Sequence, residues 1–171
     1  MAQTWTAYYA GVVFAAGKNM AGILNADAAE ILRIRRVGLL NAQTAAVVGV
    51  VCQLELRRYT GATLPGGTAI TPVSHDTTNV APATATYSYN SVPAGVSSVL
   101  RRVFWSSDEA AVAAGSIDEI ETFVPLNIIW DAGYGDANVQ ALALREDESI
   151  IVYNTTGAVG LLDTWIEFTK E

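Results

Sequence analysis

The residue types that most often carry catalysis are scarce in this chain. Its 171 residues include one histidine, His75, and one cysteine, Cys52. A serine hydrolase needs a serine, a histidine and an acid in one place, and a zinc site needs several histidine or cysteine ligands. Cys52 falls on the apolar face of its segment, and His75 lies in a loop rich in Pro, Thr and Asn. We therefore expect a buried core thiol and no catalytic pair.

Acidic residues are grouped at 118–121 and 146–148. Paired carboxylates can hydrolyse glycosides, but both groups have the composition of exposed turns, so we expect no catalysis from them.

A third polar group follows residue 130. Its glycine-separated oxygen ligands, Asp131, Asp136 and Asn138, are a calcium candidate, although their spacing differs from an EF-hand and the closing glutamate is missing. A tight glycine turn with Tyr134 at its tip is the simpler interpretation. We predict no resident metal and no cofactor.

Composition predicts one folded domain over residues 1–171. Hydrophobic residues make up 51% and charged residues 16%, which indicates a heavily buried or partner-covered surface. The net charge of −7 argues against nucleic acid as a partner, because neutralising phosphates needs a surplus of Lys and Arg. The apolar stretch 5–24 is interrupted by glycines and lacks a basic start, so we expect no signal peptide, no membrane span and synthesis in the cytoplasm.

Short apolar runs with period-two alternation, bounded by Gly, Pro, Asn and Ser, are typical of β-strands. The clearest run covers residues 51–58, where Cys52, Leu54 and Leu56 share one face. Further candidate strands cover residues 5–14, 30–40, 83–89, 96–105, 122–130, 142–144, 150–153 and 162–168. About eight strands suit two packed sheets, so we predict an all-β, eight-stranded antiparallel β-sandwich.

Several of these runs carry finer predictions. Residues 30–40 change phase at their two consecutive arginines, which predicts a β-bulge. Residues 122–130 alternate so that Ile128 belongs to the inward-facing set. Residues 142–144 and 150–153 flank an acidic tip and predict a hairpin.

The connections predict one short helix and two long loops. A capping-box pattern begins at Ser106 and leads into an alanine-rich segment that Gly115 stops, which predicts one or two helical turns. The connections 60–83 and 106–121 are long for a compact domain, so we expect them to be functional or docked against neighbours.

Arginines and aromatic residues are the candidates for contacts with other proteins. Arginine pairs within strand-like segments suit solvated faces or ion pairs between subunits. Large aromatic side chains suit core and interface packing. The candidate interface residues are Arg57, Arg58, Arg101, Arg102, Trp105, Tyr134 and Trp165.

The order of segments along the chain carries a resemblance. The sequences concerned are an N-terminal strand with Trp5, residues 31–36, residues 52–58, a loop with Thr71-Pro72-Val73, the strand with Val124-Pro125-Leu126, Glu148 before residues 150–152, and the closing residues 165–168. This order resembles small bacteriophage virion proteins with a jelly-roll fold.

The resemblance implies a structural, non-enzymatic protein of the virion. It implies a homo-oligomer, commonly a trimer, that attaches to a major capsid or tail protein as a decoration, cement or adaptor protein. The mechanism would be adhesion. Apolar strand faces buried between subunits would supply the strength of association, and charged groups would fix how the subunits align.

A carbohydrate-binding module for surface recognition is the alternative. It would use exposed aromatic side chains and the loop at residues 131–138. Binding should then change with calcium or with removal of Tyr134.

Overall fold

The computed structural model describes residues 3–42, 50–107, 126–133, 140–157 and 160–171. Within these ranges the chain is all-β, with twelve strands and no helix. It therefore offers no helix that could cross a membrane in those ranges. The strands are β1 (Gln3–Val13), β2 (Asn19–Asn25), β3 (Leu32–Asn41), β4 (Val50–Thr63), β5 (Thr68–Ala69), β6 (Val73–Ser74), β7 (Ala85–Tyr89), β8 (Ala94–Ser107), β9 (Leu126–Asp131), β10 (Leu142–Leu144), β11 (Glu148–Asn154) and β12 (Leu161–Lys170).

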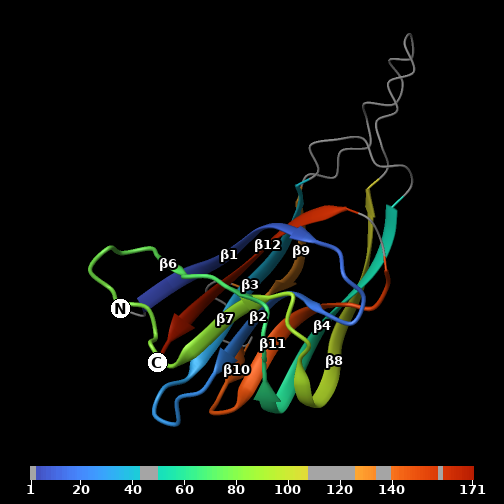
Figure 1. Cartoon of the computed structure of the whole chain (residues 1–171). Coiled ribbons are helices and arrows are strands. Elements are labelled where there is room, and N and C mark those ends of the chain that lie inside the picture. Colours follow the sequence, from blue (N-terminus) through green and yellow to red (C-terminus); the bar gives the residue numbers. More distant parts are fainter. Residues whose placement is uncertain (1–2, 43–49, 108–125, 134–139, 158–159) are drawn as a thin grey trace.

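The strands form two antiparallel sheets, visible as two layers in Figure 1. Sheet A has the order β6-β1-β12-β3, and both β9 and β10 pair with β3. Sheet B has the order β5-β7-β2-β11-β4-β8. The first and last strands are neighbours, since Gln3 pairs with Lys170 and the two chain ends lie close together in Figure 1.

An aromatic core joins the two sheets. Phe168 of sheet A is fully buried and stacks on Trp5 at 5.7 Å and on Tyr87 of sheet B at 5.6 Å between ring centroids. The Tyr9 hydroxyl, also buried, donates to the Gly22 carbonyl of sheet B at 2.8 Å. Offset stacking of this kind adds to the free energy gained by removing the rings from water.

The alternation rule succeeds where one strand face is buried. Cys52, Leu54 and Leu56 are fully buried in β4, as predicted. The predicted bulge in β3 is also confirmed, because Phe168 pairs with Ile34 and Glu167 with Arg36, which leaves Arg35 as the extra residue.

Two finer predictions are wrong. Residues 142–144 and 150–153 do not form a hairpin, because β10 pairs with β3 in sheet A while β11 belongs to sheet B. The turn between them crosses from one sheet to the other, with Asp147 at φ 55°. In β9, Ile128 faces outward and Ile129 is buried, because the register with β3 shifts by one residue.

The predicted helix does not begin at Ser106. Residues 106 and 107 end β8 through pairing with β4, and the rest of the predicted helix lies outside the described residues. β2 was not predicted, since all seven of its residues are buried and no alternation marks it. Part of the connection 60–83 pairs with the chain's own sheets, β5 with β7 and β6 with β1, while docking against a neighbour stays a prediction.

Candidate interaction surface

The outermost strand of sheet B is exposed to an unusual degree. β8 pairs with β4 and, within the described ranges, with no other strand. Every residue from 94 to 102 is exposed to solvent. Val96 is 73% and Phe104 67% exposed, and Val99 and Leu100 are also exposed. A long edge strand with apolar side chains and free backbone groups is a template for contact with another chain.

Strand geometry separates the buried from the exposed side chains of β8. Trp105 pairs with Cys52 and lies in the core, only 3% exposed. Phe104 pairs with Gln53 and therefore points to the opposite, outer face. The predicted interface residue Trp105 thus packs within its own chain, and sequence reasoning missed Phe104, which the same alternation places on the surface.

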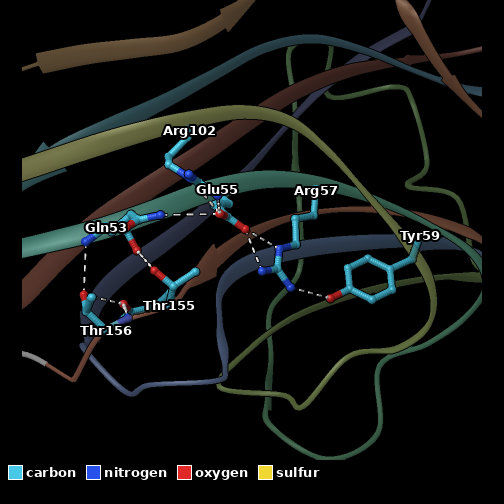
Figure 2. A network of polar contacts seen from close by, with 8 residues as sticks. Gln53, Glu55, Arg57, Tyr59, Arg102, Thr155 and Thr156 are labelled. Atoms are coloured by element: carbon cyan, nitrogen blue, oxygen red, sulfur yellow. Dashed lines mark hydrogen bonds and ion pairs between the residues drawn. The ribbon is translucent and has the colours of Figure 1, made fainter.

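A charged network lies on the outer face beside β8 (Figure 2). The Glu55 carboxylate accepts from Arg57 Nε at 2.7 Å and Nη2 at 2.6 Å through Oε2. Its Oε1 accepts from Arg102 Nε at 2.9 Å and Nη2 at 2.7 Å. The Glu55 side chain is buried beneath the two guanidinium groups, whereas Arg102 is 57% exposed.

Opposing effects set the charge state of Glu55. Burial is the largest single effect and raises the pKa of this carboxyl group, but hydrogen bonds and charges from Arg57 and Arg102 together outweigh it, so the pKa lies below its ordinary value. The Arg57 guanidinium also lies 3.8 Å from the centre of the Tyr153 ring, within cation–π range. The network is therefore fixed on one side by an aromatic ring and open to solvent at Arg102.

All four predicted interface arginines have contacts within their own chain. Arg57 and Arg102 share Glu55, Arg58 Nη2 contacts both Glu148 oxygens at 2.6 Å, and Arg101 Nη1 donates to the Ile129 carbonyl at 2.9 Å. The structure thus groups Arg57 with Arg102, while Arg58 and Arg101 contact other partners. Ion pairing between subunits remains a prediction for these residues.

Trp165 lies on a different surface, the outer face of sheet A. Its indole covers Gly38, where a Cβ atom would meet indole Cε2 and Cζ2 at 2.4 Å. Tyr8 is the neighbour of Trp165 across the pair of strands, and its hydroxyl donates to the Asp163 carboxylate. This hydrogen bond is the main reason that the pKa of Tyr8 rises to about 12. The predicted interface residues therefore do not form one surface.

The calcium candidate is described only at Asp131. Its Oδ2 contacts Arg36 Nη2 at 3.0 Å, and its Oδ1 accepts from the Gly133 amide at 2.9 Å. Asp136, Asn138 and the loop residue Tyr134 lie outside the described residues. The described ranges contain no group of three His, Cys, Asp or Glu side chains that could hold a metal ion.

Cys52 and His75 are placed in different sheets. Cys52 is buried in β4 of sheet B, its thiol contacts Asn154 Oδ1 at 3.7 Å, and burial raises its pKa to about 11. His75 follows β6 of sheet A, and its Nε2 lies 2.8 Å from Thr6 Oγ1. The prediction of a core thiol is confirmed, and the protonated thiol is a poor nucleophile at neutral pH.

No protein-family model matches this chain, and no curated protein and no solved structure is significantly similar to it.

Proposed function

We propose that this protein is a structural component of a bacteriophage virion that forms a homo-oligomer, with a trimer favoured, and adheres to a major capsid or tail protein. The observation that carries the proposal is β8, a fourteen-residue edge strand with exposed apolar side chains. Such a surface is costly to leave in water and is typical of protein interfaces.

Strand pairing supports the jelly-roll part of the proposal. The first strand pairs with the last (β1 with β12), and the second pairs with the next to last (β2 with β11). The same nesting continues inward, with β3 against β10 and β9, and β4 against β8. This is the order produced by folding a long antiparallel hairpin into two sheets, and jelly rolls are frequent among capsid proteins.

The surface around β8 suggests how subunits would adhere. Val96, Val99 and Phe104 would leave water on contact with a neighbouring subunit, which supplies most of the association free energy. Arg102 keeps more than half of its side-chain surface exposed while bound to Glu55, so it can meet an acidic group of the neighbour. Burial of the apolar side chains would supply the strength of the association, and Arg102 would fix how the two subunits align.

Light scattering on a sizing column at two protein concentrations tests the oligomer. We expect a mass three times that of the 18.1 kDa chain. Phe104→Glu should shift the mass towards one chain, because a buried unpaired carboxylate opposes association. Val80→Glu is the matched control, since Val80 is 80% exposed and lies between β6 and β7, neither of which pairs with β8. A monomeric wild-type protein, or equal effects of the two variants, would contradict the proposed interface.

Mass spectrometry of purified phage particles tests the virion assignment separately. The chain should be recovered with the particles at a fixed ratio to the major capsid or a tail protein. Recovery only in the soluble fraction of the infected cell would remove the virion assignment, even if the protein forms a trimer.

A further inference from the structure

We propose that a pocket between the end of β4 and the segment around β10 binds a sugar acid, that is, a pyranose ring bearing a carboxylate. The pocket has a volume of about 330 Å³. Its lining residues are Arg58, Trp130, Gln140, Ala141, Leu142, Ala143 and Arg145. No residue of β8 lines it, so this site goes beyond the adhesion proposed above.

Two guanidinium groups make the pocket cationic although the chain carries a net charge of −7. Arg58 is held in place by Glu148, whose Oε2 also accepts from the Arg145 amide at 2.8 Å. The Arg145 guanidinium has no hydrogen bond or ion pair anywhere in the described part of the chain. Arg58 is paired with one carboxylate and Arg145 with none in the described part of the chain, so the two guanidinium groups leave a net positive charge at the pocket, which suits an anionic ligand.

The remaining wall favours a ring over a bare anion. The Trp130 indole and Leu142 offer apolar surface, and Gln140 offers an amide that both donates and accepts. Ligand sites combine an apolar lining with a few convergent polar groups, and about 300 Å³ is the lower end of their usual volume. A pyranose has an apolar ring face for the indole and hydroxyl groups for the amide, and its carboxylate would bind the guanidinium groups.

A pair of probes that differ in one group tests this assignment. Methyl glucuronide and methyl glucoside share the ring and differ in the carboxylate. Titration of the full chain, followed by NMR, should shift the indole N–H signal of Trp130 with the glucuronide. The glucoside should bind at least about ten-fold more weakly, because it lacks the charge-assisted hydrogen bonds that the carboxylate makes.

Arg145→Gln should weaken glucuronide binding about ten-fold and leave the fold intact, because its guanidinium has no partner to lose. Lys18→Gln is the matched control, since it removes one positive charge outside the pocket, and it should bind like wild type.

Four results would overturn the proposal. These are no glucuronide binding, equal binding of the two glycosides, an Arg145→Gln variant that binds normally, or inorganic phosphate that binds as tightly without moving the Trp130 signal. A capped aspartate that binds more tightly than the glucuronide would assign the pocket to a protein side chain instead. The titration uses the chain in its own oligomeric state, so its outcome is independent of the adhesion test.

Discussion

At the scale of single residues, Glu55 is the most constrained charged group described in this chain. Its carboxylate is removed from water on an outer sheet face, which costs free energy unless it is paired. Arg57 and Arg102 provide four contacts of 2.9 Å or less, two to each oxygen. The network stabilises the fold only as long as the carboxylate stays ionised.

Glu55→Gln should therefore lower the free energy of unfolding at pH 7 by about 1–3 kcal/mol, because two guanidinium groups lose their shared counter-charge. Urea denaturation followed by tryptophan fluorescence measures this loss. Glu146→Gln is the matched control, since Glu146 is exposed and its side chain has no contact within the described ranges. Equal stability of the Glu55→Gln variant and wild type would contradict the role given to the network.

The same substitution has a defined pH dependence. The pKa of Glu55 is lowered in the folded state from an ordinary value of 4.5, so its stabilising contribution is complete well above pH 4.5. As pH falls through the lowered pKa, the folded state takes up the proton and the contribution disappears. The difference in stability between wild type and Glu55→Gln should therefore shrink below pH 4.5 and stay constant above pH 6.

At the scale of elements, the bulge in β3 keeps the apolar side chains of both halves of the strand on the core face. Leu32 and Ile34 face the core before the bulge, and Val37 and Leu39 face it afterwards. In a regular strand these two sets would point to opposite faces. Arg35 is the extra residue that turns the later apolar side chains back to the core face. Pairing with β12 resumes at Arg36, which lies opposite Glu167.

Deletion of Arg35 should therefore leave a folded protein with a regular β3. The expected loss is about 1–2 kcal/mol, from the hydrogen bonds that the Arg35 side chain and carbonyl make with Thr169 and Ala132. Deletion of Glu167 is the contrasting control, since it would move the buried Phe168 to the outer face and cost about 3–5 kcal/mol. Thermal unfolding of the two deletion variants compares them, and a larger loss for the Arg35 deletion would contradict this explanation.

Alternation in the sequence was sufficient to predict the half-buried elements. β4 and β12 each have one face in the core, so their apolar phase was visible. β2 was missed because both of its faces are buried, and Asn19 is tolerated there through its hydrogen bonds to Ser88 and Ser91. The false hairpin had a different cause, since no local signal distinguishes a turn within a sheet from one that crosses between sheets.

Part of the Glu55 network was also visible in the sequence. Glu55 and Arg57 are two residues apart in a strand, so they must share a face. The contribution of Arg102 depends on the pairing of Glu55 with Arg102 between β4 and β8. This contact joins distant parts of the chain and is not visible in the local sequence. The arginines were predicted to contact a neighbouring subunit, whereas Arg57 is paired with Glu55, two residues away in the same strand.

At the scale of the whole molecule, the nested strand pairing makes the fold depend on contacts between distant parts of the chain. Gln3 and Lys170 are paired, and β12 lies between β1 and β3 in sheet A. Closing such separations is entropically costly and makes folding slow compared with helical proteins of this size. The terminal strand therefore closes the sandwich, because without it β1 and β3 have no common neighbour.

A chain ending at residue 160 should consequently not fold. It would lose the buried side chains of Leu162, Ile166 and Phe168 and leave β1 without its main partner. Circular dichroism and sizing should report an unfolded or aggregated chain, and a synthetic peptide of residues 161–171 added during refolding should restore the sandwich by strand addition. Replacing residues 76–79, which are exposed apart from the half-buried Asn79, with a short glycine-serine linker is the control. It should leave a folded protein, because their described hydrogen bonds reach no further than Ser74 at the end of β6. A cooperatively folded chain of residues 1–160 would mean that the two sheets are held together without their central strand, and would contradict the closing role of β12.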